Sequence, residues 1–316
     1  MKYFTTAHDV IDLDDLVQEA LNIKQNPYAF PQIGKNKTLG LIFMNPSLRT
    51  RLSTQKAAMN LGMNVMVMNI DKEGWALEMD DGAIMNGTNV EHVKDAAAVI
   101  GQYCDVVGIR CFPSLQNKQE DYSEKVLLKF MENCAVPVVS LESATLHPLQ
   151  SFADLMTIKE HWNEKRKPKV VLNWAPHIKA LPQAVANSFS EWMCKAEMDF
   201  VITHPKGYEL SEDYTKGTTI YHNQDEALKD ADFVYVKNWS TYNDDYGKVV
   251  STDSDWMLTN EKLKMTNNAK VMHCLPVRRN VELSDEVLDG KNSLVIEQAN
   301  NRLYAAQAVL KKILEK

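Results

Sequence analysis

The chain has 316 residues, of which 45% are hydrophobic and 24% are charged, as is usual for a globular protein. This length exceeds what one hydrophobic core usually serves, which predicts two domains. The formal net charge of −7 disfavours nucleic acid as the main partner, because phosphate backbones are bound by basic stripes. A small anionic ligand remains compatible with it, since a binding site depends on local charge.

The N-terminus and the cysteines indicate the environment of the protein. No run of about 20 apolar residues is present, so we expect neither a transmembrane helix nor a membrane partner. The first residues, MKYFTTAHDVIDLDDL, are acidic and lack an apolar signal core. The five cysteines are scattered and form no CxxC pair, which is typical of reduced thiols and not of a zinc site. We therefore expect a cytoplasmic protein without a metal or a cofactor.

In the N-terminal half, short apolar runs alternate with amphipathic segments. We predict strands at 38–44, 64–70, 105–110 and 137–142, and helices at 47–62, 92–103, 122–134 and 148–163. The first of these helices places Leu48, Leu52 and Met59 on one face.

The charged stretch NEKRKPK at 163–169 precedes a second set of elements. We predict strands at 169–175, 199–205, 232–238, 269–275 and 293–298, and helices at 181–196, 224–230 and 299–315. The β-α alternation in both halves predicts an α/β protein with two doubly wound parallel-sheet domains, divided near residue 150.

Ligands of such sheets bind beyond the carboxyl ends of the strands. Polar and ionisable residues collect at these positions: Ser47, Arg49, Thr50, Arg110, Glu142, His147, His177, Lys237, Asn238, His273 and Cys274. Their accumulation predicts a functional site at these sheet edges.

The segment NPSLRTR follows the first predicted strand. Ser47 stands at a predicted N-cap, so the helix N-terminus, two hydroxyls and Arg49 would form a pocket suited to phosphate. A capped helix on a solvated surface explains this segment equally well. Neither GxxxxGKS nor GxGxxG occurs, so an ATP P-loop and a dinucleotide fingerprint are not supported.

Two further segments carry histidines. In HPLQSFADL, His147 precedes Pro148, which fits the first position of a helix, and Gln150 lies in the first turn. Capping or packing would also explain His147. In MHCLPVRRN, a His273–Cys274 dyad is disfavoured, because adjacent residues of a strand point to opposite faces.

Together these segments resemble the aspartate/ornithine carbamoyltransferase family. The family signatures S-x-R-T-R, H-P-x-Q-x-x-x-D and H-C-L-P match residues 47–51, 147–154 and 273–276, in order, and the resemblance covers essentially the whole chain. It implies the carbamoyltransferase fold and a homotrimer with active sites shared between subunits. Residues 1–150 would bind carbamoyl phosphate, residues 151–298 would bind the acceptor, and the helix at 299–316 would return to the first domain.

The resemblance also implies the residues of the site. Carbamoyl phosphate would be bound by Ser47, Leu48, Arg49, Thr50, Trp75 of a neighbouring subunit, Arg110, His147, Pro148, Leu149, Gln150, Cys274, Leu275 and Arg302. The acceptor would be bound by Glu142, His177, Lys237, Leu275 and Arg278, with Asn187 as a weaker candidate. The catalytic set would be Arg49, Thr50, Arg110, His147 and Cys274.

The acceptor is expected to be an N-acylated ornithine. The S-M-G motif of plain ornithine enzymes is missing, and the corresponding region reads KNWSTYNDDYGK. The segments GWALE, VVLNWAPH, LPQAVANSF, YVKNW and HCLPVRRN are similar to the acetylornithine and succinylornithine branch.

Val90 bears on the choice of acyl group. In this branch a glutamate before the E-H pair resembles the acetylornithine type and a proline the succinylornithine type, whereas here the residue is Val90. An uncharged side chain would not repel the extra carboxylate of a succinyl group. We therefore expect N-succinyl-L-ornithine as the acceptor. Acetylornithine is the alternative, because Glu91 could take the acidic role.

The expected reaction is direct attack of the neutral δ-amine on the carbonyl carbon of carbamoyl phosphate, with arginines binding the phosphate. Cys274 would position the amine. A non-catalytic, anion-binding scaffold would be expected to lack a motif residue, yet the core set is intact. An oxidoreductase of the Rossmann type is disfavoured by the missing glycine fingerprint.

Overall fold

The computed structural model describes residues 1–243 and 245–315. The chain divides into two compact units. The first contains residues 1–114, 119–149 and the chain from Arg302 onward, and the second contains residues 115–118 and 150–301. The boundaries fall inside α7 (Pro148–His161) and α13 (Val295–Leu314). The ligands assigned above to the two domains stay predictions.

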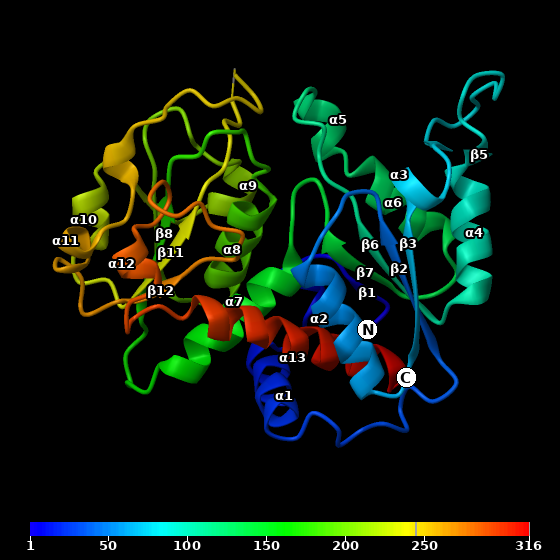
Figure 1. Ribbon diagram of the computed structural model, residues 1–316, viewed down its shortest axis with the longest axis horizontal. Helices are drawn as coiled ribbons and strands as arrows, with labels where there is room; N and C mark the ends of the chain where they lie inside the picture. The colour runs from blue at the N-terminus through cyan, green and yellow to red at the C-terminus, as the bar shows by residue number, and fades with distance from the viewer. Residues whose placement is uncertain (244, 316) are drawn as a thin grey trace. The chain divides into compact units, whose positions relative to one another are not determined.

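The first unit contains a parallel sheet with strand order β1-β7-β6-β2-β3 (Figure 1). Its strands are β1 (Tyr3–Phe4), β2 (Thr38–Phe43), β3 (Asn64–Asn69), β6 (Val106–Arg110) and β7 (Val138–Glu142). Its helices include α1 (Leu13–Gln25), α2 (Arg49–Asn60), α3 (Ile70–Glu73), α4 (Val93–Tyr103), α5 (Lys118–Tyr122, which begins at the unit boundary) and α6 (Lys125–Asn133). A short helix η1 (Ala7–Asp9) and the pair β4 (Leu77–Glu78) and β5 (Glu91–His92) complete the unit.

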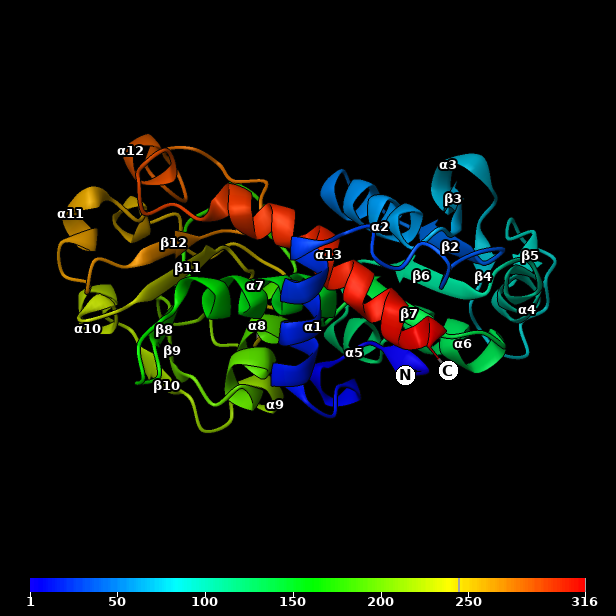
Figure 2. The ribbon, with the colours of Figure 1, turned by 90° about the horizontal axis from the view of Figure 1, so that it is seen from below.

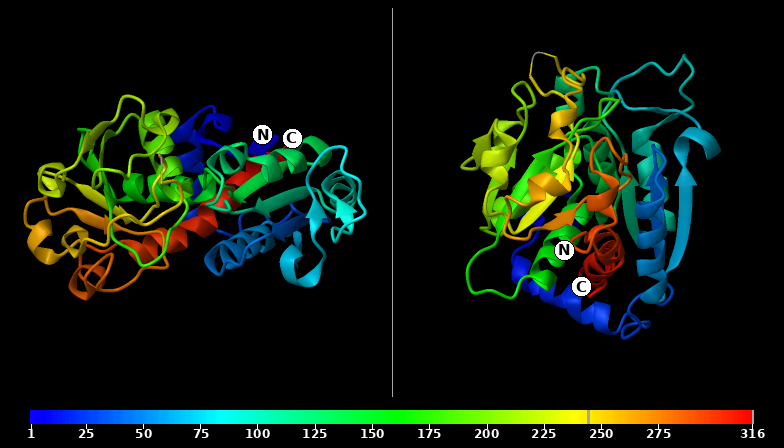
Figure 3. Two further views of the ribbon diagram at one scale, coloured as in Figure 1. Left: turned by 90° about the horizontal axis from the view of Figure 1, so that it is seen from above. Right: turned by 60° about the vertical axis from the view of Figure 1, so that its left-hand side comes forward.

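Helices cover both faces of this sheet, as Figure 2 shows for α2 and α6. On one face α4 and α6 enclose a core that includes Ile42, Val107, Phe130 and Val138. Residues of β2 and β6 are therefore buried on both sides, which explains their unbroken apolar runs. Gly108 allows close packing there, because a Cβ would lie 3.0 to 3.2 Å from the side chains of Leu41 and Leu141, which would have to shift by a few tenths of an ångström. The N-terminal strand and the end of α13 lie side by side (Figure 3).

The second unit contains a parallel sheet with strand order β10-β9-β8-β11-β12. Its strands are β8 (Lys169–Trp174), β9 (Asp199–Thr203), β10 (Thr219–Tyr221), β11 (Phe233–Lys237) and β12 (Lys270–Met272). Its helices include α8 (Ala184–Lys195), α9 (Glu212–Thr215), α10 (Gln224–Leu228), η2 (Ser254–Trp256), α11 (Asn260–Leu263) and α12 (Asp285–Leu288). Valines of β8, β11 and β12 lie in its core, together with alanines that flank these strands.

In each sheet the direction in which the chain adds successive strands reverses once. The chain leaves the middle of the first sheet at β2 in one direction and returns through β6 on the other side, and it does the same at β8 and β11 of the second sheet. Such switch points, at the carboxyl ends of the strands, are where open α/β sheets bind ligands. The doubly wound α/β class predicted from the sequence is confirmed.

Most predicted strands and helices are confirmed within a few residues, but 293–298 is not a strand. Residues 295–298 form the first turn of α13, which begins four residues before the predicted start. Short apolar runs fit a buried strand and a buried helix equally well. Here Ser293 makes only an isolated bridge to Val271 before the helix begins. No helix among the described residues combines the length and apolar character that a membrane crossing requires.

Candidate functional site

The β2–α2 corner carries the S-x-R-T-R signature. The prediction that Ser47 caps α2 is wrong: the N-cap residue is Leu48, and the described residues provide no side-chain cap hydrogen bond there. Leu48 already has helical dihedral angles, φ −84° and ψ −62°, so Ser47 lies one residue too early to cap. A helix N-terminus without a capping side chain offers its first N–H groups to an anion.

Thr50 connects this corner to a distant part of the chain. Its hydroxyl oxygen accepts a hydrogen bond from Nη2 of Arg302 at 2.5 Å, across 252 positions of sequence. Thr50 is 1% exposed and Arg302 is 6% exposed, so water competes little for this contact. The last helix thereby places a guanidinium beside the first turn of α2. The two residues therefore lie together, as expected for one anion site.

Arg110, Glu142 and His147 form a second cluster, at the ends of β6 and β7. Arg110 Nη1 forms an ion pair with Glu142 Oε2, and His147 Nε2 lies 3.5 Å from the same oxygen. The Arg110 guanidinium also stacks over Phe112, with 4.3 Å from its carbon to the ring centroid. All three charged or titratable side chains are buried. Glu142, predicted as an acceptor ligand, therefore lies among the predicted carbamoyl-phosphate ligands.

Arginines of both groups, the α2 corner and the ends of β6 and β7, act on the pKa of His147. Burial lowers the pKa of His147 well below its usual value of 6.5. The positive charges of Arg302, Arg110 and Arg49 lower the same pKa further. The imidazole is thus a neutral hydrogen-bonding group, and its buried Nδ1 has no hydrogen-bond partner among the described residues. Three arginines against one carboxylate leave this region positive, as a phosphate dianion requires.

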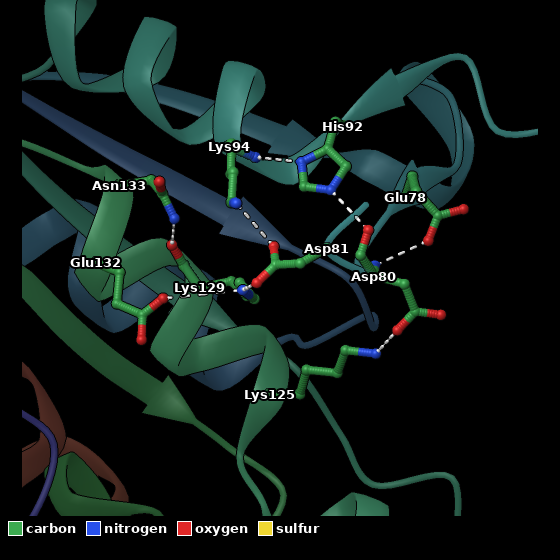
Figure 4. A network of polar contacts seen from close by, with 9 residues as sticks. All are labelled: Glu78, Asp80, Asp81, His92, Lys94, Lys125, Lys129, Glu132 and Asn133. Carbon is green, nitrogen blue, oxygen red and sulfur yellow. Dashed lines mark hydrogen bonds and ion pairs between the residues drawn. The ribbon is translucent and has the colours of Figure 1, made fainter. Parts of the chain in front are cut away.

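The loop from Gly74 to His92 carries Trp75 and Val90. Figure 4 shows how ion pairs hold this loop: Asp81 bonds Lys94 at 2.9 Å and Lys129 at 2.6 Å. Asp80 pairs with Lys125, and its carbonyl oxygen lies 3.0 Å from His92 Nε2. Lys94 lies on α4, whereas Lys125 and Lys129 lie on α6. The loop is thus tied to two helices of the first unit.

Two side chains of interest in this loop are exposed. Trp75 is 53% exposed and Val90 is 65% exposed, so neither packs into its own unit. Trp75 Nε1 donates to Glu91 Oε2 at 2.8 Å. The carboxylate of Glu91 is therefore engaged by the indole.

In the second unit, two glutamine side chains donate hydrogen bonds to Asp154 near the start of α7. Gln150 Nε2 donates to Asp154 Oδ1 at 2.8 Å, and Gln298 Nε2 donates to the same oxygen at 2.7 Å. Gln298 Oε1 in turn accepts the backbone N–H of His273 at 2.8 Å. Gln150 Oε1 is buried and has no partner among the described residues. The H-P-x-Q-x-x-x-D and H-C-L-P segments are therefore held together through Gln298.

The H-C-L-P segment follows β12. His273 Nδ1 accepts the backbone N–H of Leu275 at 2.9 Å, and its Nε2 lies 3.3 Å from Glu282 Oε1. Both ring nitrogens thus have partners other than Cys274, which agrees with the rejection of a His–Cys dyad. Cys274 is buried, at 8% exposure. The Leu275–Pro276 peptide bond is cis.

Beside it, His177 and Arg278 form a polar group at the ends of β8 and β12. Arg278 Nε donates to His177 Nε2 at 2.9 Å, and His177 Nδ1 lies 2.8 Å from the carbonyl oxygen and 3.0 Å from the backbone nitrogen of Lys179. Burial lowers the pKa of His177, and the charges of Lys237 and Arg278 contribute in the same direction. Lys237, at the end of β11, is buried at 7% exposure.

Glu282 is a member of this group that sequence reasoning missed. Although burial would raise it, the pKa of Glu282 is lowered to about 2 by His273, Lys237 and the backbone N–H of Arg278. No motif marks Glu282, and only its position opposite these groups reveals it. Gln298 was missed for the same reason.

The remaining predicted residues are placed as follows. Pro148 and Leu149 open α7, as expected, and Asn187 is buried within α8. Arg279, next to the predicted ligand Arg278, is half-exposed and pairs with Asp285 at 2.9 Å and Asp289 at 2.7 Å. The charge of Arg279 is therefore largely neutralised by these two nearby carboxylates.

The fold and these motifs define a class of protein that comparison with known families identifies. Residues 3–160 match the family description "Aspartate/ornithine carbamoyltransferase, carbamoyl-P binding domain", and residues 182–313 match "Aspartate/ornithine carbamoyltransferase, Asp/Orn binding domain". The chain belongs to the aspartate/ornithine carbamoyltransferase family, whose members are enzymes that transfer a carbamoyl group.

Within the family, the similarity is graded. The chain is 48% identical to an N-succinylornithine carbamoyltransferase of Bacteroides fragilis (strain 638R), over 100% of this chain and 99% of that protein. It is 34% identical to an N-acetylornithine carbamoyltransferase of Xylella fastidiosa (strain Temecula1 / ATCC 700964), over 98% of each. A crystal structure of acetylornithine transcarbamylase complexed with acetylcitrulline has a TM-score of 0.92 at 32% identity and covers 99% of both chains.

Proposed function

We propose that the protein transfers the carbamoyl group of carbamoyl phosphate to the δ-amine of N-succinyl-L-ornithine, giving N-succinyl-L-citrulline and phosphate, as a step of arginine biosynthesis. The observation that carries this proposal is the 48% identity, over the whole chain, to an N-succinylornithine carbamoyltransferase. The identity is lower to N-acetylornithine enzymes, at 32 to 34%, and to two ornithine enzymes, at 28 and 32%.

In the first unit, the corner of β2 and α2 is proposed to bind the phosphate of carbamoyl phosphate. Arg49, Arg302 and Arg110 supply positive charge, and Ser47 and Thr50 supply hydroxyls. The buried Thr50–Arg302 hydrogen bond supports this proposal because it fixes a guanidinium at the helix N-terminus before any ligand arrives. Charge that develops on the leaving phosphate would then be met by groups already in position.

His147 is proposed to hydrogen-bond the carbamoyl oxygen, together with Thr50 and Arg110. Its lowered pKa supports a role as a neutral hydrogen-bonding group, since a buried imidazolium beside three arginines would be strongly disfavoured. The reaction is direct: the lone pair of the neutral δ-amine attacks the carbonyl carbon and a tetrahedral intermediate forms. Phosphate then leaves with the electrons of the C–O bond and accepts the proton that the attacking nitrogen loses.

In the second unit, the acceptor is proposed to be bound by His177, Lys237 and Arg278, with the Leu275 carbonyl and Cys274 orienting the amine. Lys237 and Arg278 are cationic groups suited to the two carboxylates of succinylornithine. Glu282 supports the arrangement, because its carboxylate accepts the backbone N–H of Arg278 at 2.8 Å and offsets the charge of Lys237.

Val90 is proposed to permit the succinyl group. Crystal structures of N-acetyl-L-ornithine transcarbamylase in which one glutamate is replaced by serine or proline are complexed with carbamyl phosphate and N-succinyl-L-norvaline, with a TM-score of 0.93 to this chain at 32% identity. The resemblance aligns Val90 with that kind of specificity position. N-acetyl-L-ornithine is the second candidate, favoured by the neighbouring carboxylate of Glu91.

A homotrimer is proposed from the exposed apolar side chains of the first unit. Leu48, Leu52 and Met59 on α2 are 58 to 67% exposed. Met66 and Met68 lie on β3, an edge strand, and are 55% and 41% exposed. A second copy of the chain would bury this surface and bring Trp75 to a neighbouring site. Light scattering on the purified protein tests it: a monomer mass at micromolar concentration would contradict the proposal.

The expected cytoplasmic location stays a prediction.

The decisive assay measures citrulline-product formation with carbamoyl phosphate and each of ornithine, acetylornithine and succinylornithine. We expect the highest kcat/KM with succinylornithine. A higher value with acetylornithine would overturn the choice of acyl group, and no product with any acceptor would overturn carbamoyl transfer itself.

A further inference from the structure

Two histidines lie side by side at the carboxyl ends of β9 and β10, in the second unit. Thr203 and Tyr221 are paired in register on these strands, and the next residues are His204 and His222. The backbone N–H of His204 donates to the Tyr221 carbonyl oxygen at 3.1 Å, and the two imidazoles meet edge to face with centroids 5.1 Å apart. Glu209 reaches the same point from the turn after β9, so that one ligand atom from each residue lies within 4.8 Å of the others.

Backbone carbonyls determine which nitrogen each imidazole presents. Nδ1 of His204 lies 2.8 Å from the Pro205 carbonyl oxygen, and Nδ1 of His222 lies 3.1 Å from the His204 carbonyl oxygen. A carbonyl oxygen can only accept, so both Nδ1 atoms carry the hydrogen and both Nε2 atoms present a lone pair. Histidines that bind metal ions are oriented by the same kind of hydrogen bond from the other ring nitrogen.

His204 lacks a partner for that lone pair. Its side chain is fully buried, and Nε2 has no hydrogen-bond partner among the described residues. Buried polar atoms are nearly always satisfied, so an unpartnered acceptor that faces a second imidazole and a carboxylate indicates a ligand.

The turn that carries Glu209 is held in place before any ion binds. Gly207 has φ +92°, a left-handed conformation that favours glycine. The backbone N–H of Tyr208 donates to the Pro205 carbonyl oxygen at 3.2 Å, and Trp239 Nε1 donates to the Tyr208 carbonyl oxygen at 2.8 Å. Gly207 N–H then donates to one carboxylate oxygen of Glu209 at 3.1 Å. The second oxygen can therefore serve the ion.

We propose that His204, Glu209 and His222 bind one divalent transition-metal ion, preferentially Zn²⁺, with water completing the coordination. Two imidazole nitrogens and a carboxylate are ligands that zinc accepts, whereas Mg²⁺ and Ca²⁺ prefer oxygen atoms alone. The ion would join the turn after β9 to the end of β10 and so stabilise this edge of the sheet. The site has no part in the proposed carbamoyl transfer, and it replaces the expectation from the sequence that the chain binds no metal.

Isothermal titration of the chelator-treated, full-length protein with ZnCl₂ tests the proposal, with MgCl₂ as the comparison ion. We expect one zinc per chain at this site, no comparable binding of magnesium, and a loss of zinc affinity of about tenfold or more in Glu209→Gln and in His222→Ala. His161→Ala is the matched control, because it removes a histidine of the same unit that pairs with Glu297 at 2.7 Å. It should bind zinc as the unaltered protein does. Fully buried His204 is left in place, since its replacement endangers folding.

Two further measurements separate this site from zinc bound elsewhere. Zinc should raise the melting temperature of the unaltered protein and of His161→Ala, and raise it less in His222→Ala. Co²⁺ bound in place of zinc should give a visible spectrum without a thiolate-to-cobalt band, which excludes cysteine ligands. Equal zinc affinity in all four proteins, no zinc binding, or a thiolate band would each overturn the proposal.

Discussion

Replacement of Thr50 by valine tests the anion site with little change of shape. Valine keeps the volume and β-branching of threonine and removes only the hydroxyl, which accepts the hydrogen bond of Arg302 Nη2 at 2.5 Å. Thr50 and Arg302 are 1% and 6% exposed, so water does not easily replace the lost acceptor. The same hydroxyl is one of the groups proposed to contact carbamoyl phosphate.

The expected magnitude follows from this geometry. A hydrogen bond to a charged group contributes about 1.5 to 3 kcal/mol, and each 1.4 kcal/mol corresponds to about a factor of ten. Thr50→Val should therefore lower kcat/KM for carbamoyl phosphate by about 10- to 150-fold. The fold should persist, because α2 keeps its apolar contacts, and urea unfolding should show a loss of stability no larger than the contribution of this one hydrogen bond to Arg302.

The assay follows N-succinylcitrulline formation at saturating acceptor while carbamoyl phosphate is varied. Thr54→Val is the control, since Thr54 lies one turn further along α2 and is also buried, at 3% exposure. It should leave kcat/KM within about twofold, as is usual for changes outside a site. If Thr50→Val behaves like Thr54→Val, the hydroxyl does not serve the donor site and the reasoning fails.

Four other changes give distinct results. Arg49→Ala should reduce turnover by orders of magnitude in the same assay, because the phosphate loses a cation, and near-normal turnover would refute its role. Cys274→Ser should retain measurable activity if the thiol only positions the amine, whereas complete loss in a folded variant would point to a covalent role. Val90→Glu should shift preference from succinylornithine to acetylornithine: two like charges about 6 Å apart at an effective dielectric near 20 repel by about 3 kcal/mol, and unchanged ratios of kcat/KM would contradict this. His147 has a lowered pKa in the folded state, so the unfolded chain binds more protons as pH falls below 6.5. The free energy of unfolding should therefore fall as pH falls through that value, and His147→Gln should reduce the dependence; an identical slope in urea titrations from pH 5 to 7 would show that His147 does not cause it.

The sequence by itself determined the strands, the class of fold and the donor motif. Apolar runs such as TLGLIF read clearly because both faces of a parallel sheet are buried, and Pro148 marked the start of α7 because proline fits the first helical position. It failed where local signals are ambiguous. Residues 293–298 fitted a strand or a buried helix, and Ser47 resembled a cap until the backbone placed Leu48 there.

Only the tertiary structure decided which side chains meet. Thr50 and Arg302 are 252 positions apart, and Arg110 and Glu142 are 32 positions apart. Patterns within a short stretch of sequence therefore predict neither contact. Glu282 and the group of His204, Glu209 and His222 were invisible for the same reason. Periodicity reports which face of an element is buried, whereas contacts between elements depend on strand order and register, which bring together carboxyl ends that the sequence keeps far apart.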